Sequence, residues 1–475
     1  MSPDTAPKPT YDELAGIVAE LRASVARLEK RVGVLEQENG RLRSALEEAR
    51  RAGKRQAGPF SKGEPKADPK PPGRRPGEAH GPSAFRAVPE VIDEVHDAPL
   101  PARCPDCDVD LIEVRVAAQY QTEIPKVRPI VRRFDVHVGF CPCCRARVQG
   151  RHPLQTSDAL GSAASQLGPQ ALALANHLHT ELGTPFGKVR TFFQTFFGLV
   201  VSCGGLARGL GRLAKKLEPT YDGLLAEVRT SEVVYPDETS MRVSGRLGWL
   251  WVFVTPQATV YVQRMSRGFD VIDEVLGADY DGVAVHDGWS PYDRLALALH
   301  QQCLAHLLRR ARELIEVALG MAARFPKQVK ALLQDALALR DRRDAGEVSP
   351  HGVLVATGQL EIRLTDVLAT HTTDPANERF RKHLAGHRDD LFTFLRLPNV
   401  EATSWPADHA TRPAVLFRKV SGGHRSLAGA HAHEVLASVA RTCWQRAADG
   451  FVLAVRALCM PDLKALAIRP ALPGP

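Results

Sequence analysis

The sequence lacks the features that would place the chain in or across a membrane. No apolar run approaches the roughly 18 residues that a spanning helix needs. The first ten residues, MSPDTAPKPT, lack the apolar core of a secretion signal, so we expect a cytoplasmic protein. Cysteine is also scarce, with nine residues in 475. In a reducing compartment these cysteines indicate metal ligands or buried thiols rather than disulfides.

Positive charge is concentrated in one segment. The net charge is +8, and residues 50–86 alone hold ten lysines and arginines against three acids, a net of +7. The surrounding stretch, residues 49–88, is rich in proline, glycine and lysine and is too polar to fold alone. We expect a flexible basic tether there, which either solubilises the chain or seeks phosphate groups.

Residues 11–48 repeat leucine at every seventh position. The leucines, read as heptad position d, are Leu14, Leu21, Leu28, Leu35 and Leu42. The residues at position a are Val18, Val25, Val32, Asn39 and Leu46. β-Branched a positions with one asparagine favour a parallel two-stranded coiled coil in which Asn39 fixes the register. One amphipathic helix packed on its own domain is the other reading, but five unbroken heptads favour the coil and therefore at least a dimer.

Residues 89–152 contain two CxxC motifs, Cys104–Cys107 and Cys141–Cys144, separated by strand-like sequence. Four thiolates on a small hairpin would form a tetrahedral zinc site and stabilise a module too small for a large core. Cys143 could replace Cys144 as the fourth ligand, and unmetallated buried thiols are the alternative. The remaining cysteines, which we expect in the core, are Cys203, Cys303, Cys443 and Cys459.

Residues 153–228 change to a helical period. We expect short helices between 168 and 217, with basic residues such as Lys188 and Arg190 alternating with apolar ones. This pattern fits a helix-turn-helix-like DNA-binding segment. Any helical bundle also has solvated basic faces, so that simpler reading stays open.

From residue 229 the pattern alternates between strands and helices. The expected strands are 232–237, 248–255, 258–263 and 282–287, and the expected helices are 268–277 and 291–299. Three antiparallel strands followed by a βα alternation is the order of an RNase H-like sheet. In that sheet the first and fourth strands are neighbours.

Two acids end these neighbouring strands, Asp237 in VVYPD and Asp287 in GVAVHD. Carboxylates that lie so close repel each other unless one is protonated or a cation lies between them. A pair of divalent ions held by shared carboxylates activates water for attack on phosphate, and hard oxygen ligands suit magnesium or manganese. For Asp237 alone, an acid that caps the next turn is the simpler interpretation. Glu238 should point to the opposite face.

Four segments, two of which contain these acids, resemble one known family, the transposases of the IS66 insertion sequences. They are VVYPDETSMRVSGRLGWLWVFVT, VAVHDGWSPYD, HQQCLAHLLRR and TRPAVLFRKVSGGHRSLAGAHAHEVLASVARTC. The upstream order of zipper, basic tether and CxxC pairs is also similar, so the resemblance covers nearly the whole chain. It implies a DDE-type enzyme of the bacterial cytoplasm, nucleoid-associated in use, that nicks and joins DNA at element ends with magnesium. The family's first two acids fall on Asp237 and Asp287.

The third acid departs from the family's pattern. In TSWPADHATRP, Ser404 stands where the family has Asn and Asp408 where it has Glu. Aspartate can ligate the same ion, but its carboxylate lies one methylene nearer the backbone, and a shift near ~1 Å can cost about a hundredfold in rate. The resemblance thus implies Asp237, Asp287 and Asp408 as catalytic, magnesium-binding residues. A catalytically impaired relic that only dimerises and binds DNA is the alternative.

The resemblance also implies that a helical insertion divides the catalytic core. The core would cover 229–306 and 398–460 with its C-terminal helices, and the insertion 307–397. At the first junction His300, Cys303 and His306 either imitate a metal cluster or pack between a strand and a helix.

The loop 412–426 is expected to supply further phosphate contacts around Gly422 and Gly423, with a solvated loop as the alternative. Its basic residues are Arg412, Arg418, Lys419 and Arg425. The prediction as a whole is a multidomain α and α/β protein. It would use magnesium or manganese and zinc, and its partners would be double-stranded DNA, a second copy through the coil and accessory proteins of the element.

Overall fold

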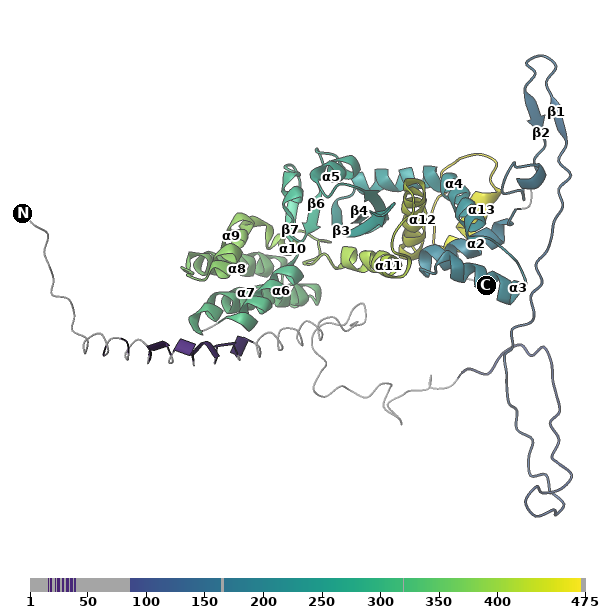
Figure 1. Cartoon of the computed structure of the whole chain (residues 1–475), viewed down its shortest axis with the longest axis horizontal. Helices are drawn as coiled ribbons and strands as arrows, with labels where there is room; N and C mark the ends of the chain where they lie inside the picture. Colours follow the sequence, from purple (N-terminus) through teal and green to yellow (C-terminus); the bar gives the residue numbers. More distant parts are fainter. Residues whose placement is uncertain are drawn as a thin grey trace, which may run out of the picture. The chain divides into compact units, whose positions relative to one another are not determined.

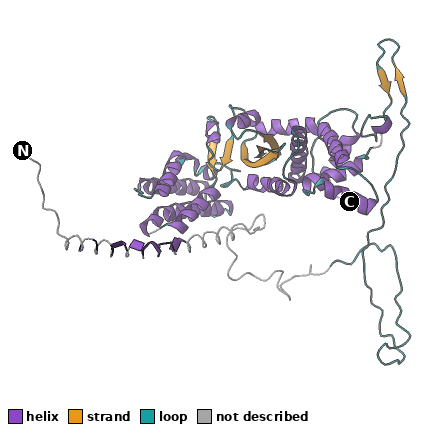
Figure 2. Ribbon diagram, viewed as in Figure 1, coloured by secondary structure: helices purple, strands orange, loops and turns teal. Residues whose placement is uncertain are grey.

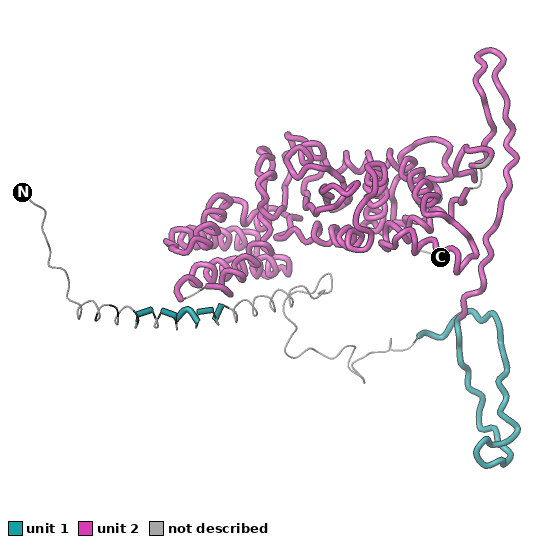
Figure 3. The backbone as a smooth tube through the Cα atoms, in the orientation of Figure 1, with its two compact units in different colours: residues 1–122 teal, residues 123–475 magenta. Residues whose placement is uncertain are grey.

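The computed structural model describes residues 86–163, 166–318 and 320–470, together with scattered positions between 16 and 39. The chain divides into two compact units, residues 1–122 and 123–475 (Figure 3). In the described part, no helix is long and apolar enough to cross a membrane.

The described positions of the heptad pattern are helical and exposed. They are Val18, Val25, Leu28, Val32, Leu35 and Asn39. The other predicted dimerisation residues, Leu14, Leu21 and Leu42, lie outside the described residues, as does the tether up to residue 85. The coiled coil and the tether therefore stay predictions.

A mixed five-stranded sheet forms the centre of the second unit (Figure 2). The strands are β3 (Val233–Val243), β4 (Arg246–Val254), β5 (Thr259–Arg264), β6 (Val283–His286) and β7 (Leu299–Gln302). Their order is β5-β4-β3-β6-β7, with β3, β4 and β5 antiparallel and β6 and β7 parallel to β3. The expected neighbours, the first strand and the strand ending in VAVH, are indeed adjacent.

Two local expectations about this sheet were wrong. The helix expected at 291–299 is a 3-10 turn, Ser290–Arg294, followed by the unpredicted strand β7. Leu299–Gln302 pair in parallel with β6, and this pairing outweighs the helical pattern that precedes them, because propensity is weak against tertiary contacts. Asp237 also lies inside β3 rather than at its end, since β3 continues along β4 as far as Val243.

Alternate residues of the strands enter two different cores. On one face Val234, Trp251 and Phe253 pack with α4 (Cys203–Arg229), α5 (Phe269–Leu276) and α12 (Leu427–Gln445). On the other face Tyr235 and Val252 pack with α6 (Leu304–Val317) and α11 (Trp405–Ser421). This division follows from the two-residue period of a strand. The sheet is therefore covered by helices on both faces (Figure 1).

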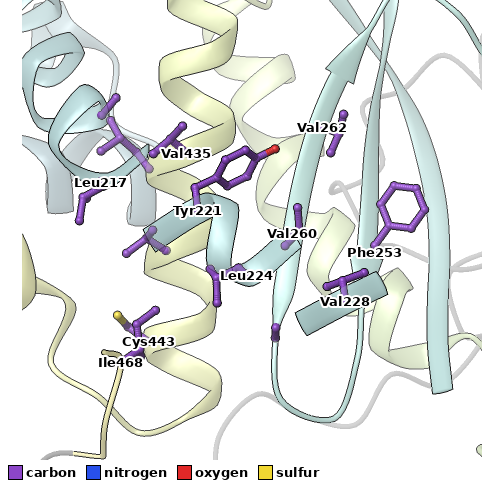
Figure 4. Close-up of a cluster of buried hydrophobic side chains, with 14 of the residues drawn as sticks. Leu217, Tyr221, Leu224, Val228, Phe253, Val260, Val262, Val435, Cys443 and Ile468 are labelled. Carbon is purple, nitrogen blue, oxygen red and sulfur yellow. The ribbon is translucent and has the colours of Figure 1, made fainter. Parts of the chain in front are cut away.

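Helix α4 joins the N-terminal helices to the sheet. It follows α2 (Pro169–Asn176) and α3 (Phe186–Phe197), and it extends beyond the expected boundary at 217. Figure 4 shows Leu217, Tyr221, Leu224 and Val228 of α4 in one core with Val260 and Val262 of β5. Tyr221 also donates a 3.0 Å hydrogen bond to the Tyr261 carbonyl. The helical segment thus shares a core with the sheet instead of folding apart from it.

The helices between β7 and α11 lie largely within residues 307–397, where the insertion is predicted. After α6 they are α7 (Arg324–Asp344), α8 (Pro350–Ala369), α9 (Pro375–Gly386) and α10 (Thr393–Arg396). The remaining described elements are β1 (Val138–Phe140), β2 (Arg147–Gln149) and α13 (Gly450–Cys459), with short 3-10 and π turns.

A ladder of side chains from α12 covers the outer edge of β5. Ser438 accepts a hydrogen bond from the Tyr261 amide at 2.9 Å, Thr442 from the Thr259 amide at 3.1 Å and Glu434 from the Gln263 amide at 2.8 Å. Four helical residues rise about 6 Å and two strand residues span about 6.6 Å, so the two spacings match. The ladder satisfies an edge that would otherwise expose unpaired amides.

A buried histidine cluster joins α11 and α12 to the turn after α2. The ring of Phe417 lies 5.2 Å from His424 and 4.8 Å from His433, while His179 approaches Phe417 edge-on. Burial, with the charge of His179 adding, lowers the pKa of His424 to about 4. Burial likewise holds the pKa of His433 well below its ordinary value, so the cluster is neutral near pH 7.

Candidate active site

The register of β3 and β6 gives Asp237 and Asp287 equivalent positions. Val234 pairs with Ala284, and each acid follows its member of that pair by three residues. Asp237 is half-buried within β3, whereas Asp287 is exposed in the turn after β6. The turn is tight: the Asp287 Oδ1 accepts a 2.9 Å hydrogen bond from the Trp289 amide, and Gly288 has φ +87°.

Helix α11 supplies the third predicted acid and lies against β3. Asp408 is in its first turn, where the helix dipole favours negative charge. One turn later, Thr411 donates a 3.1 Å hydrogen bond to the Asp237 Oδ2. Residues three apart share a helix face, so Asp408 and Thr411 are both directed toward this part of β3.

The Asp237 carboxyl lies within electrostatic reach of two other acids, Glu238 and Asp408. Burial raises the pKa of Asp237 to about 7, and the charges of Glu238 and Asp408 add to this effect against the hydrogen bond from Thr411. Near pH 7 this carboxyl is therefore partly protonated. Its anionic form is one that a cation would favour.

The three carboxylates have suitable chemistry for a hard cation, but they are not arranged as a complete set of metal ligands. Asp237, Asp287 and Asp408 offer oxygen donors of the kind that magnesium prefers. Within the described ranges, no group of three or more His, Cys, Asp or Glu side chains is arranged to hold a metal ion. The fit thus rests on donor chemistry and on the electrostatic link between Asp237 and Asp408.

Glu238 points to the opposite face, as expected from the alternation along β3. Its side chain is 4% exposed, pairs with Arg267 at 2.7 Å and accepts a 2.9 Å hydrogen bond from Tyr292. The Arg267 guanidinium lies over Trp249 and Trp289, 4.5 and 4.1 Å from the ring centroids. The Glu238 carboxylate is thus paired and hydrogen-bonded on the face of the sheet that α5 covers.

Cys303 and His306 form a pair beside the acids. The sequence left open whether these two residues imitate a metal cluster or simply pack between a strand and a helix. Burial would raise the pKa of Cys303, but hydrogen bonds with His306 and Ser404 outweigh it and lower the pKa. The bond to Cys303 raises the pKa of His306, and the charges of Asp287 and Asp408 add to it. His306 is therefore within electrostatic reach of two predicted catalytic acids, whereas His300 instead bonds His286, with 3.0 Å between the nitrogens.

The insertion also contacts the second acid's turn. A Cβ atom on Gly288 would lie 2.6 Å from the Gln302 Oε1 and 2.8 Å from the His383 ring of α9. Only glycine fits between them, and its positive φ is a second reason for glycine. No periodic signal in the sequence indicates this contact.

The two CxxC turns have the same backbone geometry. The Cys104 amide bonds the Val109 carbonyl and the Asp108 amide bonds the Cys104 carbonyl. Cys141 makes the equivalent bonds with residues 146 and 145, and Asp108 and Arg145 both have positive φ.

Hydrogen bonds within each turn lower the pKa of its first cysteine. For Cys104 they come from the Asp106 and Cys107 amides and the Cys107 thiol, and for Cys141 from the Cys144 and Cys143 amides and the Cys144 thiol. Cys144 thus corresponds to Cys107. The two turns belong to different compact units.

The predicted DNA-contact residues fall into two groups. Most are exposed: Lys188 and Arg190 on α3, Arg412 and Lys419 on α11, and Arg425 after it. Arg418 is half-buried and donates hydrogen bonds to Thr239 at 3.1 Å and to the Ser240 hydroxyl at 2.7 Å. Arg418 therefore fastens α11 to β3, a role that sequence reasoning missed.

Acids on a mixed sheet and on the helix that covers it, with Asp237 and Asp408 in electrostatic reach of each other, suit an enzyme that acts on phosphate esters. Residues 164–432, more than half of the chain, match the Transposase IS66 family, and the match includes all three predicted acids. The chain therefore belongs to the IS66 family of transposases, enzymes that bind and process DNA.

Two curated relatives come from Sinorhizobium fredii (strain NBRC 101917 / NGR234). The uncharacterized protein y4qI is 24% identical over 411 residues, which cover 79% of this chain and 74% of the relative. The uncharacterized protein y4jD is 26% identical over 276 residues, 51% of this chain and 53% of that relative.

Proposed function

We propose that the chain is a DDE-type transposase that cleaves DNA at element ends and joins the freed 3′ ends to target DNA. Support comes first from the β3–β6 register, which gives Asp237 and Asp287 equivalent positions. The Thr411–Asp237 hydrogen bond then brings the helix that carries Asp408 to the same place. The strand order β5-β4-β3-β6-β7 supports an RNase H-like assignment of the sheet.

Asp237, Asp287 and Asp408 would hold divalent magnesium or manganese. Bound there, the ions would lower the pKa of an attacking water and neutralise charge on the phosphate. The chain's own part is to fix the carboxylates: β3 and β6 hold two of them, and Thr411 and Arg418 hold α11 and thereby Asp408. Because Asp408 is one methylene shorter than the family's glutamate, this position sets how fast the site works.

The exposed basic residues would bind the DNA backbone. Contacts to phosphate release counterions, so affinity should fall steeply as salt rises. The heptad pattern would pair two copies so that two element ends are held together. Each CxxC turn would supply its two thiols as ligands for a structural zinc ion, because each turn holds them ready as a pair.

A strand-transfer assay tests the proposal. Pre-cleaved element-end DNA is incubated with a target plasmid, magnesium and the full chain, and joined product is measured. We expect Asp237→Asn and Asp287→Asn to abolish joining while end binding persists. Asp281→Asn, an exposed acid at the other end of β6, is the matched control and should join like the wild type. Equal joining by the Asp237 variant would overturn the proposal.

A further inference from the structure

An exposed aromatic cluster lies at the start of α11. Two of the chain's five tryptophans are exposed, Trp405 at 59% and Trp444 at 63%, and both belong to this cluster. The His409 ring lies between them, stacked on Trp405 with centroids 5.2 Å apart and 19° between planes. It is 5.7 Å from Trp444 on α12, at 37°. Three flat rings thus follow one another across two helices at the surface.

A cation completes the cluster and holds it in place. The Arg441 guanidinium carbon lies 4.0 Å from the Trp444 ring centroid, and Arg441 donates a hydrogen bond to the His409 Nδ1. A guanidinium has donors only, so the His409 Nδ1 is the acceptor in this hydrogen bond. The rings are therefore fixed before any ligand arrives.

The cluster is next to the predicted third acid. Trp405 precedes Asp408 by one helical turn and His409 follows it directly. Asp408 is within electrostatic reach of Asp237, so the cluster borders the acidic site rather than a remote surface. A ligand on these rings would lie beside the acids.

We propose that Trp405, His409 and Trp444, with Arg441, bind an unpaired base of the DNA that the acidic site acts on. The inference rests on the proposed function. A base within a duplex has both faces covered by its neighbours, and only a base outside the stack offers a face to a side chain. Aromatic rings bind such faces whatever the sequence, and arginine adds a cation for the ring or the adjoining phosphate.

A nucleobase fits this surface better than an apolar protein partner does. The rings are interleaved with a guanidinium and an imidazole, and the exposed Arg412 follows on the same helix. Arg441 and His409 bond each other, but an apolar partner would still take their remaining polar atoms and the Arg412 charge out of water, which costs free energy. A base and its phosphate would satisfy them.

Binding of DNA with and without bases tests the inference. The full chain is titrated, without magnesium and at fixed salt, into a labelled duplex with a single-stranded overhang, and into the same duplex with an abasic overhang. Affinity is followed by fluorescence anisotropy. We expect Trp405→Ala and Trp444→Ala each to weaken binding to the base-bearing overhang about five- to a hundredfold. Binding to the abasic overhang should not change.

Two variants act as controls. Trp405→Phe keeps an aromatic face and should retain most of the affinity. Leu354→Ala on α8 removes an apolar side chain that is as exposed, at 65%, but lacks an aromatic ring, and should bind both DNAs like the wild type.

Three outcomes would overturn the inference. They are unchanged binding to both DNAs, equal losses on both, and loss of self-association in sedimentation with the base preference intact. The last would make this face an interface between copies. Because the titration needs no catalysis, its failure leaves the strand-transfer test of the acids unaffected.

Discussion

The hydrogen bonds of the ladder between α12 and β5 can be removed one at a time by substituting the α12 side chains. Ser438 is fully buried, and its hydroxyl accepts from the Tyr261 amide while donating to the Glu434 carbonyl one turn earlier. Ser438→Ala leaves that amide buried without an acceptor, which costs about 1–3 kcal/mol. Alanine's better helix propensity returns about 0.5 kcal/mol. We expect a net loss of about 0.5–2.5 kcal/mol in the free energy of unfolding.

Hydrogen exchange and urea unfolding measure this loss at two levels. Exchange of β5 amides, followed by mass spectrometry, should accelerate in Ser438→Ala, and the urea midpoint should fall. Thr191→Ala on α3 is the matched control. Thr191 also donates to the carbonyl four residues earlier, but it is exposed. Its substitution should change stability by no more than about 0.5 kcal/mol.

The result that would refute the reasoning is a Ser438→Ala protein with wild-type stability and wild-type exchange in β5. The Tyr261 amide would then find another acceptor, and the matched spacing of α12 and β5 would have no energetic consequence.

Three further predictions concern the acidic site, the histidine cluster and the cysteines. Asp408→Glu should raise the rate of strand joining, by up to about a hundredfold for ~1 Å; an unchanged or lower rate would mean that the site is adapted to aspartate. The unfolded chain protonates His424 near pH 6.5 but the folded chain only near pH 4, so stability should fall by up to about 3 kcal/mol as pH drops through this window. In His424→Phe, the free energy of unfolding, measured by urea titration at each pH, should change less between pH 6.5 and pH 4 than in the wild type. An equal change would contradict the assignment. Mass spectrometry of the purified chain should find zinc that Cys104→Ser and Cys141→Ser abolish and that Cys143→Ser retains; loss in the Cys143 variant would reassign the fourth ligand.

The positions of the strands could be predicted from the sequence because buried strands are short, apolar and bounded by turns. VVYPD and GVAVHD therefore identified β3, β6 and their acids, and the chain order predicted that the two strands are neighbours. The continuation of β3 past Asp237 could not be predicted from the sequence. It depends on pairing with β4, and the polar residues after Asp237 do not themselves indicate a strand.

Contacts between distant segments account for most of what the sequence could not predict. In the sequence, Thr411 and Arg418 cannot be told from other residues of a basic helix. Their roles depend on the packing of α11 against β3. Likewise Leu299–Gln302 form β7 because β6 offers them a parallel partner, although the pattern of residues 291–299 favours a helix. Neither depends on a local period, so neither has a signal within a few residues.

The acceptors for the outer amides of β5 lie more than 170 residues further along the chain. The residues of the sheet therefore emerge from the ribosome long before α12 is synthesised, and during that interval the outer edge of β5 in the nascent chain is unpaired. Such an edge invites pairing with other chains. Shortened products that end before Leu427 should accordingly aggregate or require a chaperone, even with every strand and all three acids already made.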